Sequence, residues 1–180
     1  QIAALTSTQI GAMETADLAS LTTSSLRSIT PASLAGLTSA QVQALTTTQF
    51  AALTTAQIGG LTSTQAPILE TADLAALGSA QIAALGVSAV GALTSAQIQS
   101  MSTGQFAVLA QLAALETADL AALTTAQIKL LGSAQIDALG SAQMAALTSA
   151  QVVALTTAQV STLSTADLAA LTTAQFAVMR

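Results

Sequence analysis

The stretch LTTTQFAALTTAQIGG, residues 45–60, holds two copies of one eight-residue unit, and near-copies of this octad fill the rest of the chain. We letter its positions a to h, starting at the leucine. Position a is almost always Leu, position b is usually Thr, Ser or Gly, and position e is usually Gln or Asp. Position f is a second apolar site, and positions g and h are mostly small. A chain built in this way is a repeat array, and such a pattern predicts the fold more directly than it predicts any chemical activity.

The register of the array changes only once. Position a recurs every eight residues from Leu5 to Leu109 and again from Leu115 to Met179, and the unit between them, residues 109–114, is six residues long. We therefore predict one octapeptide-repeat array over residues 1–180 with a register break at 109–114. Because both termini fall inside a unit, we expect these residues to be a window of a longer array.

Each octad carries the signals of a helix start. In the pattern Thr-x-x-Gln, the Thr side chain accepts a hydrogen bond from the amide three residues on, and the Gln side chain accepts one from the Thr amide, which forms a capping box. The apolar residues at a and f then flank the box as a hydrophobic staple. Leu45 with Phe50 and Leu53 with Ile58 are examples. Repetition of this pattern in strict register predicts one short helix per octad.

The spacing argues against one long helix, because eight residues leave a drift of roughly 80° per octad and the apolar residues would spiral around it. Helices this short are marginal alone, so neighbouring octads must stack. We predict an all-α solenoid of very short capped helices, one per octad. A Thr-rich β-solenoid is the alternative, since Thr and Ile favour strands whereas Ala, Gln and Leu favour helix. The predicted core includes Leu45, Phe50, Leu53, Ile58, Leu147, Val152, Leu171 and Phe176.

A few octads replace the Thr/Gln box with two acids. The functional interpretation is a recurring cation site of the kind that could take Ca²⁺, and the structural one is that acids are stabilised at helix starts. The second is favoured, because calcium takes six to eight oxygen ligands. The candidate cation ligands are Glu14, Asp17, Glu70, Asp73, Glu116 and Asp119. We expect local bends at three further irregular places, which are either hinges or tolerated defects of the repeat. They are residues 59–60, residues 65–68 and the short unit 109–114.

Composition excludes several classes of function. The 180 residues include 8 acids, 3 bases and no His or Cys, for a net charge of −5. A basic patch for nucleic acid, a Cys/His metal site and a base that could activate a Ser or Thr nucleophile are therefore lacking. Mean hydropathy is +0.70, but polar residues interrupt every octad, so no membrane-spanning segment is predicted. We expect no enzyme activity, no cofactor and no small-molecule substrate.

The units LTTAQI, residues 53–58, and LTSAQI, residues 93–98, resemble the LTTAQ-type arrays of very large bacterial exoproteins that are described as adhesion or haem-utilisation proteins. The resemblance covers the whole chain and implies a secreted, surface-associated structural protein. Haem binding does not carry over, because the chain has no His or Tyr.

These observations together predict a structural repeat protein, an extracellular rod or a filament whose partners are other copies of itself. Scarce charge leaves little repulsion between copies. An adhesin stalk or binding solenoid and an intracellular length ruler are the alternatives, and ice binding through rows of Thr is a more remote one.

Overall fold

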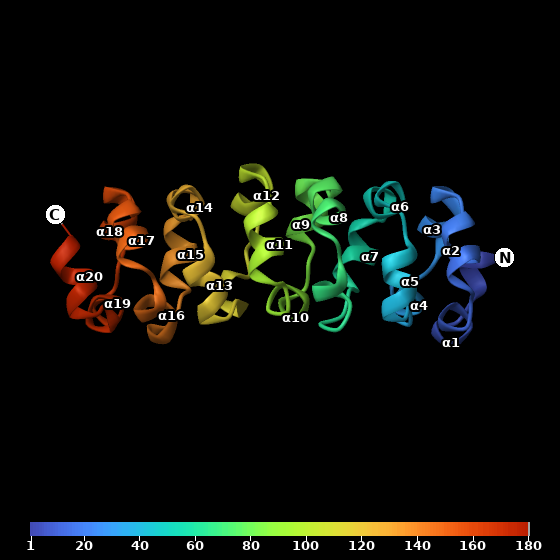
Figure 1. Cartoon of the computed structure of the whole chain (residues 1–180), viewed down its shortest axis with the longest axis horizontal. Coiled ribbons are helices and arrows are strands. Elements are labelled where there is room, and N and C mark those ends of the chain that lie inside the picture. Colours follow the sequence, from blue (N-terminus) through green and yellow to red (C-terminus); the bar gives the residue numbers. More distant parts are fainter. Residues whose placement is uncertain (180) are drawn as a thin grey trace.

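The computed structural model describes residues 1–179 and contains twenty short α-helices and three 3₁₀ helices, with no strand in that range. The all-α prediction is confirmed and the β-solenoid alternative is wrong. Figure 1 shows the helices coiling along one axis, with the two termini at opposite ends. The elements are η1 (Ile2–Ala4), α1 (Ser7–Gly11), α2 (Thr15–Ser20), α3 (Thr23–Ser28), α4 (Pro31–Leu34), α5 (Ser39–Ala44), α6 (Thr47–Ala52), α7 (Thr55–Gly59), η2 (Ala66–Ile68), α8 (Thr71–Ala76), α9 (Ser79–Ala83), α10 (Val87–Val90), α11 (Ser95–Ser100), α12 (Thr103–Ala107), η3 (Leu112–Ala114), α13 (Thr117–Ala122), α14 (Thr125–Leu130), α15 (Ser133–Asp137), α16 (Ser141–Ala146), α17 (Ser149–Ala154), α18 (Thr157–Ser161), α19 (Thr165–Ala170) and α20 (Thr173–Val178).

Helix starts follow the capping-box prediction. At α7, Thr54 has an extended backbone (φ −73°, ψ 158°), and its Oγ1 accepts a 3.2 Å hydrogen bond from the Gln57 amide. In return, the Thr54 amide donates to Gln57 Oε1 at 2.8 Å. The preceding helix, α6, ends at Ala52, and the residue that follows it, Leu53, is also extended (φ −59°, ψ 144°). A regular octad is therefore one short helix followed by a corner, because position a and the capping residue both leave the helical region.

Two units contain no α-helix and correct the prediction of one helix per octad. Residues 61–68 form only η2, because Pro67 lacks the amide that a continuing helix would need. The f position there is Ala66, which is fully buried, whereas Ile68 is only half-buried. The six-residue unit 109–114 forms η3, which is too short for an α-helical turn with its cap.

Helices stack in three columns, so three octads make one turn of the solenoid. In the first column, α1 packs on α4, α4 on α7, α7 on α9, and the series continues through α12, α14 and α17 to α20. The second column runs through α2, α5, η2, α10 and η3 and later α15 and α18, and the third through η1, α3, α6, α8, α11, α13, α16 and α19. Successive turns approach closely: a Cβ atom added at Gly36 would lie 2.6 Å from Ser7 Cβ. The register break falls in the second column, where η3 packs on α10.

Positions a and f form one continuous apolar core between the columns. The predicted core residues Leu45, Phe50, Leu53, Ile58, Leu147, Val152 and Leu171 are all buried. The prediction for Phe176 is wrong, because its side chain is 47% exposed. Its helix, α20, packs on α17 of the preceding turn, and no later helix within the described chain covers its other side.

Candidate functional site

The most distinctive chemistry of the chain is a buried glutamine at position e that joins two turns of the solenoid. Gln57 is only 1% exposed. Its Oε1 accepts from the Thr54 amide, which closes the capping box within its own octad. Its Nε2 donates to the carbonyl oxygens of Leu26 and Ile29, both at 2.8 Å, in the preceding turn. One side chain therefore satisfies backbone groups on two turns that the short helices leave without partners.

The same arrangement recurs along the whole solenoid, and we call it the glutamine ladder. In each case Nε2 donates to backbone carbonyl oxygens of the preceding turn, 26 to 31 residues earlier in the chain. Its members are Gln41, Gln49, Gln57, Gln65, Gln81, Gln97, Gln105, Gln127, Gln135, Gln143, Gln151, Gln159 and Gln175. The glutamines belong to helices of all three columns, so the ladder is a set of side-chain bonds that join each turn to the preceding one along the length of the molecule.

The ladder also spans the two defective units. Although residues 61–68 lack an α-helix, Gln65 donates to Leu34 and Leu37 as its counterparts do. Across the six-residue unit, Gln127 reaches Ile98 over 29 residues and Gln135 reaches Leu109 over 26, two fewer than the usual 31 and 28. The chain thus loses two residues without losing the bond between turns, which favours a tolerated defect over a hinge.

Sequence reasoning found only half of this site. The capping role of Gln follows from the Thr-x-x-Gln pattern, but the bonds of Nε2 join octads that are three and four units apart. One signal could have shown them: a capping box accepts Glu as readily as Gln, yet no octad of this chain has Glu at position e. Glu lacks the amide donor, so its absence indicates that the donor is used.

Acidic octads break the ladder locally. Asp73 and Asp119 are buried, and each accepts a hydrogen bond from a hydroxyl of the preceding turn: Thr47 Oγ1 to Asp73 Oδ1 at 2.9 Å, and Ser95 Oγ to Asp119 Oδ1 at 2.6 Å. A carboxylate cannot donate to a carbonyl. The Leu45 carbonyl, which lies 28 residues before Asp73, accordingly takes no hydrogen bond from residues 1–179.

The predicted cation ligands lie as three separate pairs. Glu14, Glu70 and Glu116 are exposed, as is Asp17, whereas Asp73 and Asp119 are buried. Helix α11 lies between α8 and α13, and α2 is in another column, so the pairs do not meet. No group of three or more acids close enough to hold a metal ion occurs in the described part of the chain. What the pairs do in this structure is start helices.

We expect Asp73→Gln to stabilise the protein. The new amide can donate to the Val42 and Leu45 carbonyls, as the ladder does elsewhere, and satisfying a buried acceptor is worth about 1–3 kcal/mol, less about 1 kcal/mol for the lost Thr47 bond. Chemical denaturation of the variant should show a higher midpoint. Asp17→Gln is the matched control, because Asp17 is exposed and residues 1–179 contain no turn before its own to which the new amide could donate. Equal effects of the two substitutions would contradict the ladder.

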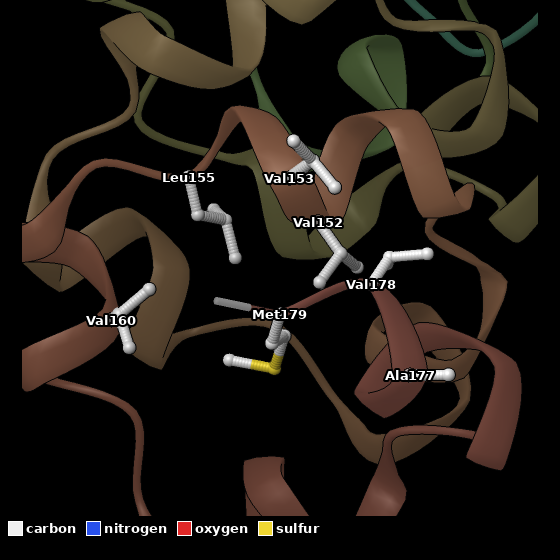
Figure 2. Close-up of a pocket in the computed structure, with 7 residues that line it drawn as sticks. All are labelled: Val152, Val153, Leu155, Val160, Ala177, Val178 and Met179. Carbon is white, nitrogen blue, oxygen red and sulfur yellow. The ribbon is translucent and has the colours of Figure 1, made fainter.

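An apolar hollow of about 510 Å³ lies near the C-terminal end, between α17, α18 and α20. Figure 2 shows the side chains of Val152, Leu155 and Met179 directed into it, with Val160 at one side. It is lined by Val152, Val153, Leu155, Val160, Ala177, Val178 and Met179. Its lining side chains include no acid, base or nucleophile, so it offers packing surface rather than chemistry.

Comparison with known proteins gives one match. The model of the ALTTAQ repeat family matches residues 10–47, 67–103, 112–149 and 145–180, together more than half of the chain. No curated protein matches the chain, and no solved structure does. As for the membrane, none of the helices within residues 1–179 has the length and apolar character needed to cross a bilayer.

Proposed function

We propose that this chain, which belongs to the ALTTAQ repeat family, is a structural protein: a rod segment that associates with further copies of itself into filaments on a bacterial surface. Its role is mechanical, not catalytic. The observation that carries this proposal is the glutamine ladder, because its hydrogen bonds join octads that would be unstable alone to the neighbouring turns of one continuous solenoid.

The ladder supports the rod directly. In a repeat protein each unit contacts only its neighbours, so stiffness depends on the bonds between successive turns. Here each turn is tied to the next by apolar packing at positions a and f and by buried side-chain bonds such as those from Gln151 to Leu120 and Leu123, both at 2.8 Å. Bending the rod would have to open these bonds in a buried, low-dielectric setting, where unpaired polar groups are costly.

Composition supports association between rods. Charged residues make up 6% of the chain, and the net charge is −5 over 180 residues. Little electrostatic repulsion therefore opposes contact between two copies. Because the surface repeats with every turn, weak contacts between two rods can recur along their length and add up.

We expect the purified protein to form filaments or bundles whose assembly depends only weakly on salt, because few ion pairs are available for salt to screen. Sedimentation velocity and negative-stain electron microscopy at low and high NaCl would measure this. A strictly monomeric particle at high concentration in both conditions would remove the filament from the proposal. What would remain is a single rod, either a stalk that displays a binding domain or a length ruler.

A cell-surface location is the second part of the proposal, and it rests on the resemblance to bacterial exoproteins. Immunogold labelling of intact cells and of thin sections of the same cells would test it. Label confined to the cytoplasm would favour the length ruler instead, and surface label on unassociated rods would favour the adhesin stalk.

A further inference from the structure

The glutamine ladder is complete in two stretches of the chain and interrupted in the stretch between them. In residues 37–68 and 123–162, the complete sections, every octad has Gln at position e, and each of these glutamines donates to the preceding turn. Residues 69–122, coloured from green to yellow in Figure 1, we call the sparse section. The only glutamines of the sparse section that donate to the preceding turn from position e are Gln81, Gln97 and Gln105.

Two octads of the sparse section make no side-chain bond from position e. Ala89 fills this position in α10 and is fully buried, and Gly86 before it has no side chain to cap the helix. The Leu61 carbonyl, which a glutamine at this position would reach, takes no hydrogen bond from residues 1–179. Gln111 fills the position in the six-residue unit, where η3 begins without a side-chain cap. Its Oε1 is buried and has no hydrogen-bond partner in the described part of the chain.

Other bonds replace only part of what the sparse section lacks. Asp73 and Asp119 each accept one hydroxyl bond from the preceding turn. Gln99 Nε2 donates to the Ala122 carbonyl, but this bond is exposed, so water competes with it. The apolar core at positions a and f continues without interruption, as the buried side chains of Phe106 and Leu109 show. The sparse section is therefore folded, but fewer buried hydrogen bonds join its turns.

We propose that the sparse section is an extensible part of the rod, which opens reversibly while the complete sections stay folded. In a repeat protein each turn is held only by its neighbours, so a weakly bonded turn is not supported by strong turns elsewhere. Opening also lets water bond the Leu61 carbonyl and Gln111 Oε1, which lowers its free-energy cost relative to turns where every such group is paired. The inference goes beyond self-association, because it concerns one chain.

Three variants test the extensible section. Ala89→Gln restores a ladder position: its amide can donate to the Leu61 carbonyl, and its oxygen can accept from the Gly86 amide, as Gln135 Oε1 accepts from the Gly132 amide at 2.7 Å. Ala72→Gln is the matched control, because it adds the same side chain at an exposed position of the same section.

Gln151→Ala makes the opposite change in a complete section. It removes the 2.8 Å bonds from Gln151 Nε2 to the carbonyls of Leu120 and Leu123.

Hydrogen exchange followed by mass spectrometry would measure opening section by section within one chain. In the wild type we expect amides of the sparse section to exchange at least about tenfold faster than those of the complete sections, the effect of roughly 1.4 kcal/mol. Ala89→Gln should slow exchange in the sparse section by a similar factor, and Ala72→Gln should leave it unchanged. Gln151→Ala should speed exchange around α17. Circular dichroism would verify that each variant is folded.

Single-molecule stretching would test extension itself. The first extension of the wild type should release no more than about 190 Å of chain, the extended length of residues 69–122. It should require a higher force in Ala89→Gln and the same force in Ala72→Gln.

Several results would overturn the extensible section. One is exchange in the sparse section that is no faster than in the complete sections. Another is a folded Ala89→Gln variant that exchanges and stretches as Ala72→Gln does. If Ala89→Gln does not fold, Gln151→Ala still decides, because unchanged exchange around α17 would mean that ladder bonds do not control opening. None of these results depends on whether copies associate, so the proposed filament is tested separately.

Discussion

Replacing Gln57 with alanine is expected to lower the free energy of unfolding by about 3–5 kcal/mol, because each buried polar group left without a partner costs about 1–3 kcal/mol. The substitution leaves the Thr54 amide on one turn, and the Leu26 and Ile29 carbonyls on the turn before, without their hydrogen-bond partner. Urea denaturation followed by circular dichroism would measure the change.

Two companion variants separate the bonds between turns from the capping box. Gln9→Ala removes a glutamine that caps its own helix but makes no bond to another turn within residues 1–179, so we expect a loss of only about 1 kcal/mol in this chain. Gln57→Glu keeps the acceptor and removes the donor, and we expect it to be at least as damaging as Gln57→Ala. If Gln57→Ala were no worse than Gln9→Ala, the bonds across turns would contribute nothing to stability.

Leu53→Asp is expected to unfold the central octads, with a loss of more than about 4 kcal/mol, because it removes a buried aliphatic side chain and leaves an unpaired charge in an apolar site. Leu53 is 3% exposed. Thermal denaturation should show a large fall in the transition temperature, or two transitions if the rod separates into independently melting halves.

The matched control is Thr55→Asp. Thr55 is exposed and is the first residue of α7, where an acidic side chain is favourable by some 0.3–1 kcal/mol. We expect this variant to be as stable as the wild type or slightly more so. Equal damage from both substitutions would mean that positions a and c do not differ in burial, contrary to the structure.

The acidic octads show that the residue at position e does more than cap its own helix, because it also bonds the preceding turn. A carboxylate can close the box within its own octad, as Asp167 does by accepting from the Ser164 amide at 2.8 Å. It cannot donate to the preceding turn. Where Asp73 and Asp119 replace Gln, a Thr or Ser hydroxyl of that turn donates to the carboxylate instead, which reverses the direction of the bond.

The sequence by itself determined the local structure of this protein. The octad register, the capping boxes and the position of the core at a and f all follow from interactions within one unit, such as Thr54 with Gln57. Local rules suffice there because a cap and a staple join residues only three to five apart in the chain. The three failures also have simple reasons. Pro67 cannot donate a backbone hydrogen bond, the unit 109–114 is too short for an α-helical turn with its cap, and the helix of Phe176 is covered on one side only within residues 1–179.

Only the tertiary structure decided how the octads stack. Three octads per turn and the second role of Gln at position e both depend on residues that are 24 or more apart meeting in space. No local pattern fixes this separation along the chain, because the direction that the chain takes at each corner determines which helices pack on one another. The apolar residues at positions a and f require that each octad bury them against another octad. Which octad that is depends on how closely successive turns approach and on which backbone carbonyls lie free at the corners. The amide of Gln57 reaches Leu26 and Ile29 because the corner between two helices of the earlier turn lies directly beneath it.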